Sequence, residues 1–410
     1  LLRCDQAFRR RVGLVLTLAV NLTILGFFKY FNFFVDSAGA LARSLGLSPP
    51  RLYLHLILPV GISFYTFQSL SYTIDVYRRR LEPVRRLADF ALFVAFFPPL
   101  VAGPIERAAH MLPQLLRPRL ITYEQMTRGA FLILHGMFKK VAVADGLAGS
   151  VSSIYNTSGA TSWADIVAAT VLFAFQIYCD FSGYSDIARG VAKFLGFELL
   201  VNFRLPYVSR SPSEFWQRWH ISLSTWLRDY LYISLGGNGH GEWKTYRNLM
   251  VTMLLGGLWH GAAWNFVLWG LYQGAILCLY RLAAGGRPGD DEAGARQPLR
   301  AAAQVAVFFA LTCYGWLLFR ANSLGQVVGF TRVLLAGPFD AELHMMRPTL
   351  AAMLGLPFLI GYEAIEYAAG SPRFYQAPPR PVRGALYGLL VFLTLLGTSN
   401  EPTQFIYFQF

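Results

Sequence analysis

Long apolar runs follow one another along almost the whole chain, and only short polar loops separate them. The first runs extend over Val12–Val35 and Leu52–Val76. A membrane-spanning helix needs about 20 apolar residues, so each of these runs is long enough to cross a bilayer. Further runs lie at about 129–151, 163–197, 244–260, 262–282, 301–319, 350–368 and 384–398. The pattern predicts roughly nine to eleven membrane segments.

The composition excludes an ordinary soluble protein. Of the 410 residues, 55% are hydrophobic and only 14% are charged, whereas a soluble domain carries about 25% charged residues. The apolar runs are continuous and do not alternate with polar residues, which excludes a barrel of short strands. Helices satisfy their own backbone groups in lipid. We therefore predict an all-α polytopic membrane protein with a single domain over residues 1–410.

The net charge of +13 comes largely from arginines in the loops, as at 9–11 and 78–86. Basic loops of this kind mark the cytoplasmic ends of membrane helices and contact anionic lipids. We therefore expect a multi-pass membrane protein, with lipids as partners and no nucleic acid. The polar start of the chain resembles a loop before a membrane helix, so we expect the natural protein to begin earlier. A Gly-, Pro- and charge-rich stretch at about 283–300 predicts an exposed loop.

Two stretches do not suit a regular helix in lipid. The run Phe90–Ile105 contains Pro98-Pro99 and Gly103-Pro104, which predicts a broken or re-entrant segment covered by protein. The run Leu52–Val76 contains Pro59 and Gly61, where we expect a kinked helix. The four cysteines are scattered without metal-binding or disulfide spacing, so we expect no metal site.

The segment 213–235 is polar on two sides if it forms one helix. Trp216, His220 and Ser224 share one face, and a helix of this kind must be buried or line an aqueous cavity. Ser211-Pro212-Ser213-Glu214 is a good helix start, Gly236-Gly237 is a good stop, and Glu214 can pair with Arg218. His220 then either bridges two helices or lines a reaction cavity.

A second polar stretch contains Gln176, Asp180 and Tyr184, which lie four residues apart on one helical face. Its carboxylates suit a general acid and base pair, a cation site or hydrogen bonds to the 213–235 segment. The sequence leaves these alternatives open.

His260 is the strongest candidate for chemistry. It lies in an apolar and aromatic run, and an ionisable group at membrane depth is a functional hypothesis by default. The glycines at 256, 257 and 261 leave the backbone bare for close approach. Burial favours the neutral imidazole, which is the form that acts as a base. Trp259 and Trp264 are expected to wall a tunnel beside it, and Asn265 and Ser224 are candidate donors to an oxyanion.

The ordered motifs resemble the membrane-bound O-acyltransferase family. They are Asn202-Phe203-Arg204-Leu205-Pro206-Tyr207, the run 214–230 with Trp219-His220 at its centre, and Leu258-Trp259-His260-Gly261. The runs 101–104 and 180–186 are also similar to the branch of that family that contains alginate O-acetyltransferase membrane subunits. The resemblance extends from Val12 to about Arg320. This chain lacks the additional hydrophobic sequence that such proteins carry before the region of Val12.

The resemblance implies a funnel-shaped bundle with a central tunnel, His260 as the essential histidine and His220 as its companion. It implies an acyl group, most simply acetyl, that passes from a cytoplasmic thioester to hydroxyls of an extracytoplasmic polysaccharide such as alginate. The donor would be acetyl-CoA or an acyl carrier protein, used as a co-substrate without a permanently bound cofactor. A periplasmic or extracellular acetyltransferase is the expected partner, and the inner membrane of a bacterial cell is the expected location.

Other functions remain open at this point. Acyl transfer to peptidoglycan and D-alanyl transfer fit the same family core. A proton-coupled transporter could use midplane histidines and carboxylates as a relay, but it predicts two related halves, and the sequence contains no visible repeat. A subunit that only docks an enzyme predicts no loss of activity when His260 is replaced.

Overall fold

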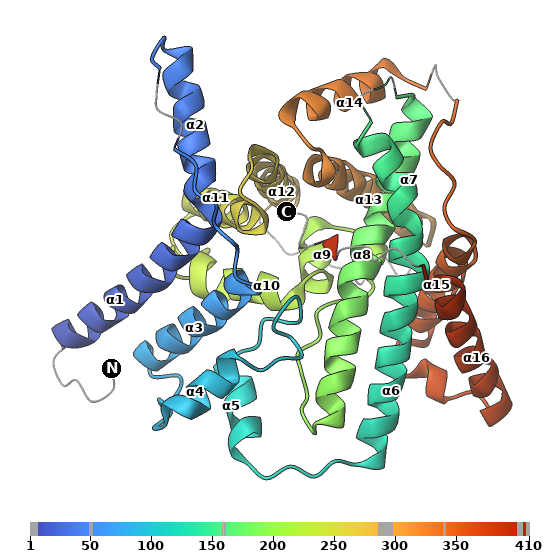
Figure 1. Ribbon diagram of the computed structural model, residues 1–410, viewed down its shortest axis with the longest axis horizontal. Coiled ribbons are helices and arrows are strands. Elements are labelled where there is room, and N and C mark those ends of the chain that lie inside the picture. The colour runs from blue at the N-terminus through green and yellow to red at the C-terminus, as the bar shows by residue number, and fades with distance from the viewer. Residues whose placement is uncertain are drawn as a thin grey trace.

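The computed structural model describes residues 7–48, 52–157, 159, 161–285, 298–338, 342–399 and 405–406. Within these ranges the chain is all-helical (Figure 1), as the sequence predicted. Five helical stretches there are long and apolar enough to cross a membrane, namely Ala7–Ser44, Trp163–Phe194, Trp264–Ala283, Pro298–Arg320 and Leu350–Ala369. Most of the loop expected at 283–300 lies outside the described residues.

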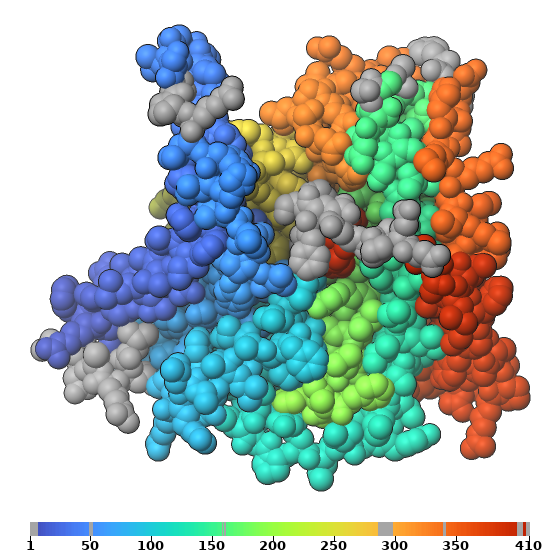
Figure 2. Space-filling model, viewed as in Figure 1, coloured from blue at the N-terminus to red at the C-terminus, as the bar shows by residue number. Residues whose placement is uncertain are grey.

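The N-terminal run forms a rod that is longer than predicted. It consists of α1 (Ala7–Leu25), a π-helical turn η1 (Gly26–Tyr30) and α2 (Phe31–Ser44). Only 6% of the residues in its most apolar window are buried, and Figure 2 shows its upper end standing apart from the rest of the molecule. Most of this surface therefore suits contact with lipid.

The expected kinked helix over 52–76 is wrong in its first half. The helix α3 covers Ile62–Tyr77 only, and Gly61 precedes it with a φ of +75°. Before it the chain is not helical, and the Asn32 side chain bonds both the N–H and the carbonyl of Leu54. Pro59 and Gly61 thus start the helix instead of bending it, because neither favours the helical interior.

The broken segment at 90–105 is confirmed. It consists of α4 (Leu87–Val94), an irregular stretch and α5 (Ala108–Leu116). The irregular backbone is covered by protein, since Ala102 and Ile105 are fully buried. Burial among helices with hydrogen-bond partners is the condition under which non-helical backbone is tolerated at such a depth.

Two long antiparallel helical columns form the centre of the molecule (Figure 1). One column is α6 (Tyr123–Met137), the π-helical η2 (Phe138–Ala144) and α7 (Asp145–Tyr155), and the other is α8 (Trp163–Phe194). A Cβ added at Gly136 would lie 2.5 Å from the oxygen of Gly183, and one added at Gly190 would lie 2.6 Å from the oxygen of Gly129. Small residues at this seam let the two backbones approach closely.

The expected single helix over 213–235 is wrong. The structure divides it into α9 (Pro212–Arg218), α10 (Ile221–Trp226) and the π-helical η4 (Leu227–Tyr232). Its start is confirmed, because the Ser211 side chain accepts a hydrogen bond from the Glu214 N–H. The Glu214–Arg218 ion pair is also present at 2.9 Å. The break falls at His220, which has a φ of +42°.

The remaining elements confirm the later apolar runs. They are the short η3 (Pro206–Val208), α11 (Glu242–His260), α12 (Trp264–Ala283), α13 (Pro298–Arg320), α14 (Leu324–Ala336), α15 (Leu350–Ala369), η6 (Phe374–Gln376) and α16 (Arg380–Leu396). The sequence analysis missed α14. Helices α11 and α12 pack closely where a Cβ at Gly257 would lie 2.3 Å from the oxygen of Phe266.

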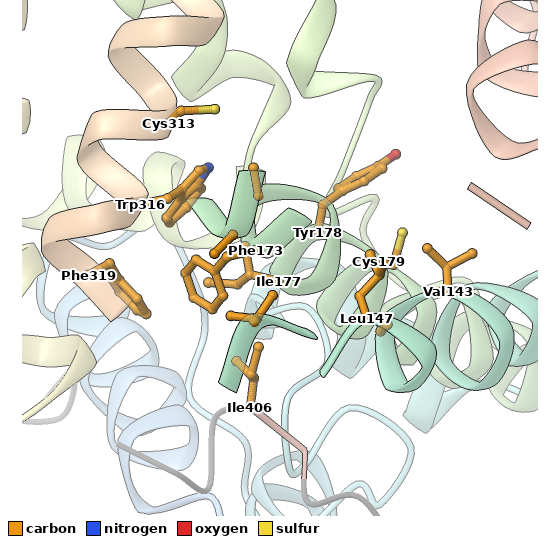
Figure 3. Packing of buried hydrophobic residues seen from close by; sticks show 14 of the residues in the cluster. Val143, Leu147, Phe173, Ile177, Tyr178, Cys179, Cys313, Trp316, Phe319 and Ile406 are labelled. Carbon is orange, nitrogen blue, oxygen red and sulfur yellow. The ribbon is translucent and has the colours of Figure 1, made fainter. Parts of the chain in front are cut away.

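The largest apolar core joins the central columns to α13 and the end of the chain. Figure 3 shows Phe173 and Ile177 of α8 with Trp316 and Phe319 of α13, and Ile406 beside them. Phe173 is fully buried, and the other four are at least 97% buried. This core fixes the C-terminal end of α13, which borders the candidate active site.

Candidate active site

His260 is the last residue of α11, and the N-terminal rod caps the last three carbonyls of this helix. The last four carbonyls of a helix have no partner within the helix. Here Tyr30 donates its hydroxyl to the carbonyl of Leu258 at 2.9 Å. The Lys29 ammonium donates to the carbonyls of Trp259 and His260. The backbone that carries the imidazole is therefore held by side chains that lie about 230 residues away in the sequence.

The His260 ring is 8% exposed and lies among aromatic rings. The ring centroids of Trp259, Trp269 and Phe319 lie 5.0, 5.1 and 5.3 Å from it, and all three meet it edge to face. A cavity of about 230 Å³ opens beside it, lined by Lys29, residues 58–64, Val101, Trp259 and His260. The predicted wall of Trp259 is therefore present, and the imidazole borders a space that a small substrate group can enter.

His220 is fully buried in the break between α9 and α10. Its positive φ costs about 1–3 kcal/mol for a residue with a side chain, and strain of this kind is concentrated at functional sites. The Nδ1 atom lies 3.1 Å from the Oδ1 atom of Asn202. An amide oxygen only accepts hydrogen bonds, so Nδ1 carries the proton and Nε2 carries the lone pair. Within the described part of the chain, Nε2 has no hydrogen-bond partner.

Trp259 brings the two histidines together. Its ring centroid lies 5.0 Å from that of His260 and 6.0 Å from that of His220. Phe67 of α3 stacks on the same indole at 5.4 Å. The sequence analysis predicted both histidines as one site although 40 residues separate them, and the structure places them around one ring.

A second and larger cavity, of about 610 Å³, approaches His220 from another side. Asn202, Ser182 and Ser185 line it, so Asn202 connects this cavity to the histidine. The charged side chains that line it are mostly basic: Arg128, Lys139, Arg189, Arg204, Arg218 and Arg373, with Asp186, Glu363 and Glu366 as the acidic ones.

A buried ion cluster forms the inner wall of this second cavity. Lys139 lies 2.7 Å from Asp186, and His135 lies 3.6 Å from the same carboxylate. Tyr178 donates to Glu363 at 2.6 Å. His135 lies in the last turn of α6 and is 7% exposed. Buried charges need such partners because their desolvation is costly.

Three predicted site residues do not serve the expected role. Trp264 does not line the cavity beside His260; it is 53% exposed and donates to Ser37 of α2 at 3.2 Å. The Asn265 amide donates to the carbonyls of Phe319 and Ala321, where it caps α13. The Ser224 hydroxyl donates to the carbonyl of Trp219 at 3.1 Å. These amide and hydroxyl donors are therefore engaged by backbone and not directed at the His260 cavity.

The other predicted residues lie near the site but touch it indirectly. Asp180 pairs with Lys140 at 2.7 Å and accepts the N–H of Ile406 at 2.7 Å. Tyr184 packs against the ring of Phe405 at 5.4 Å. Trp216 meets Trp269, which in turn contacts His260. Asp180 therefore binds the end of the chain and not the 213–235 segment.

Sequence patterns did not indicate the roles of Lys29, Asn202 and the cluster around Lys139. A lysine within a predicted membrane segment was itself a signal, because a charge at that depth is expensive. Asn202 stood inside the first recognised motif, but nothing in the sequence linked its amide to His220. The partner of Lys139, Asp186, is distant from it in sequence, and the packing of η2 against α8 brings the two together.

Comparison with known proteins gives the same family as the sequence motifs. The sequence profile of the membrane-bound O-acyltransferase family matches residues 84–284. The chain is 46% identical over 423 residues to a probable alginate O-acetylase of Pseudomonas putida, an alignment that covers 97% of this chain and 84% of the relative. The chain belongs to the membrane-bound O-acyltransferase family. The family is membrane-bound, and the five apolar helical stretches indicate that this chain crosses the membrane more than once.

Two further relatives are similar to this membrane-bound O-acyltransferase over shorter alignments. The probable alginate O-acetylase of Azotobacter vinelandii is 46% identical over 76% of this chain and 60% of the relative. The peptidoglycan O-acetyltransferase of Helicobacter pylori is 38% identical over 66% of this chain and 56% of the relative. The chain thus spans about three fifths of these two relatives. The matched family region 84–284 contains both His220 and His260.

Proposed function

We propose that this protein is an O-acetyltransferase that moves an acetyl group from a cytoplasmic thioester to a hydroxyl on the other side of the membrane. The acceptor is a polysaccharide such as alginate, or a periplasmic or extracellular partner that completes the modification. The observation that carries the proposal is the buried His260 imidazole beside a cavity, with His220 held next to it through Trp259.

His260 acts as the general base in this proposal. A hydroxyl attacks a thioester carbonyl poorly until a base accepts its proton, and a placed histidine contributes about 10²–10⁴-fold. The proton then leaves with the thiolate, which departs as the free thiol. His220 presents the lone pair of Nε2 because Asn202 fixes its other nitrogen, so it can accept a hydrogen bond that orients the hydroxyl. The carrier thiol is the other product.

The larger cavity suits the donor. Six arginine and lysine side chains line it against three carboxylates, and phosphate groups prefer such surroundings. Coenzyme A and a phosphopantetheine carrier both bear phosphate. The cavity lies between α6 and the C-terminal half of α8. The start of α6 and the end of α8 lie at the lower side of Figure 1, as does the basic loop at 78–86. Positive loops favour the cytoplasm, so we assign this side to the cytoplasm of an inner membrane.

Replacing His260 tests the proposal directly. Membranes that carry H260A at matched expression should transfer acetyl groups about 10²–10⁴-fold more slowly than wild type, measured as O-acetyl content of the polymer by mass spectrometry. H110Q is a matched control, because His110 lies in α5 and is absent from both cavity linings.

The outcomes separate the alternatives. Normal O-acetylation in H260A would refute the proposal and leave a docking role. If H260A instead loses D-alanyl or peptidoglycan esters and polysaccharide acetylation is unchanged, the acceptor is that polymer and the protein is still an acyltransferase of this family. Transport that needs a membrane potential and consumes no thioester would favour the transporter.

A further inference from the structure

The N-terminal rod carries one feature that the proposed function does not use. It is largely unburied, yet at η1 (Gly26–Tyr30) it turns from α-helical to π-helical geometry and directs Lys29 and Tyr30 toward the bundle. Single π-helical turns inside α-helices are frequent at functional sites. The turn lies where the rod meets the end of α11.

Lys29 reaches the candidate site with its whole side chain. The ammonium donates to the carbonyls of Trp259 and His260 and lies 3.4 Å from the Ser63 hydroxyl. It also lies 5.7 Å from the centre of the Trp259 ring, within the range of a cation–π contact. Because the last residue of α11 is His260 itself, these bonds act on the backbone of the histidine.

A positive charge is more than helix capping requires. An uncharged side chain could donate to the same carbonyls, as Tyr30 does to Leu258 one residue earlier. A lysine at this depth is costly and needs compensation. The negative end of the α11 dipole supplies part of that compensation. Among the described residues that line the His260 cavity, no other lysine, arginine or carboxylate is present.

We propose that Lys29 is a positioning residue for His260. It fixes the last turn of α11 through two carbonyls, so that the imidazole keeps its place against the cavity during acyl transfer. The inference rests on the proposed function, since it assigns a role within that reaction. It predicts that loss of Lys29 slows the chemical step while the donor site in the larger cavity remains intact.

The test compares three variants at position 29 in the full chain. K29M removes the donors and the charge, K29Q keeps donors without the charge, and K29R keeps both. Membranes that hold the acceptor polymer are supplied with labelled acetyl-CoA over a range of concentrations, and transfer of label to the polymer gives kcat and KM. Thermal stability in detergent is measured for each variant.

The control is N32L, three residues further along the same rod. In the described part of the chain, Asn32 bonds the backbone of Leu54 and nothing else, so its loss disturbs the rod without changing a bond to α11. H260A serves as the reference for a lost base. We expect K29M to lower kcat by about 100-fold, as a displacement of about 1 Å does, with KM within threefold of wild type. K29R should recover at least tenfold over K29M.

Each outcome decides one way. A kcat for K29M within threefold of wild type, or no lower than that of N32L, would refute the role of Lys29. A kcat for K29R or K29Q that is no higher than that of K29M would also refute it. A change in KM without a change in kcat would refute it as well. If H260A itself remains active, the proposed function fails. If H260A is inactive and K29M is normal, only the present inference fails.

Discussion

Replacement of Asn202 by leucine should show how far the site depends on one buried amide. The Oδ1 atom of Asn202 accepts from Nδ1 of His220 at 3.1 Å, from the N–H of Ser222 at 3.2 Å and from the Ser222 hydroxyl at 2.9 Å. Leucine has a similar volume but no acceptor. The Ser222 hydroxyl can rotate and the imidazole can move its proton to Nε2. The Ser185 hydroxyl, which the Asn202 amide contacts at 3.4 Å, borders the larger cavity. The main loss is therefore the partner of the Ser222 N–H.

The magnitude follows from that count. One buried donor without a partner costs about 1–3 kcal/mol of folding free energy, which should lower the melting temperature without preventing folding. The effect on activity should be larger, because a proton on Nε2 of His220 removes the lone pair that faces the site. In a serine protease, an asparagine that forces the wrong histidine tautomer costs about 10⁴-fold. We therefore expect N202L to lose about 10²–10⁴-fold in kcat.

The assay measures acetyl transfer in membranes and thermal stability in detergent on the same preparations. S222A is the matched control, because it loses the same hydroxyl contact and also the bond from the N–H of Ile105, but it leaves the His220–Asn202 bond in place. It should lose a similar amount of stability and less than tenfold in rate. An N202L protein that transfers acetyl groups within tenfold of wild type would refute the reasoning.

Three further changes test other parts of the structure. G136I should destabilise the protein by about 1–3 kcal/mol, because its Cβ would lie 2.5 Å from the facing backbone oxygen on α8. Unfolding in detergent measures this, and an unchanged unfolding midpoint would contradict the close packing. W264A should keep transfer within threefold whereas W259A loses at least 100-fold, and equal losses would mean that Trp264 reaches the site after all. The hydrogen bond from Glu106 raises the pKa of His110, so its stabilising contribution is full below pH ~6.5 and is lost as pH rises through the raised pKa. Melting temperatures should therefore fall across that window in wild type and fall less in H110Q, and parallel curves would exclude the bond as the cause.

The sequence by itself determined the helical membrane fold and the family, and it indicated His260 as the candidate for chemistry. Hydropathy acts locally, because each apolar run must bury its own backbone polar groups within lipid, and a helix does this without help from distant residues. The same local logic found the broken backbone at 98–104, where prolines and glycine exclude a regular helix. His260 stood out because a titratable ring among apolar residues has a cost that only a function or a partner offsets.

Tertiary structure alone decided how the site is built. The segment 213–235 reads as one helix, but His220 adopts a positive φ because the break aims its ring at Asn202 and Trp259. Trp264 is close to His260 in sequence yet packs on α2, whereas Lys29 is remote and bonds the His260 backbone. The direction in which a side chain leaves a helix depends on small shifts such as a π-helical turn, and its partner depends on which helix packs there. The hydrophobic periodicity of one segment predicts neither the direction of a side chain nor its partner.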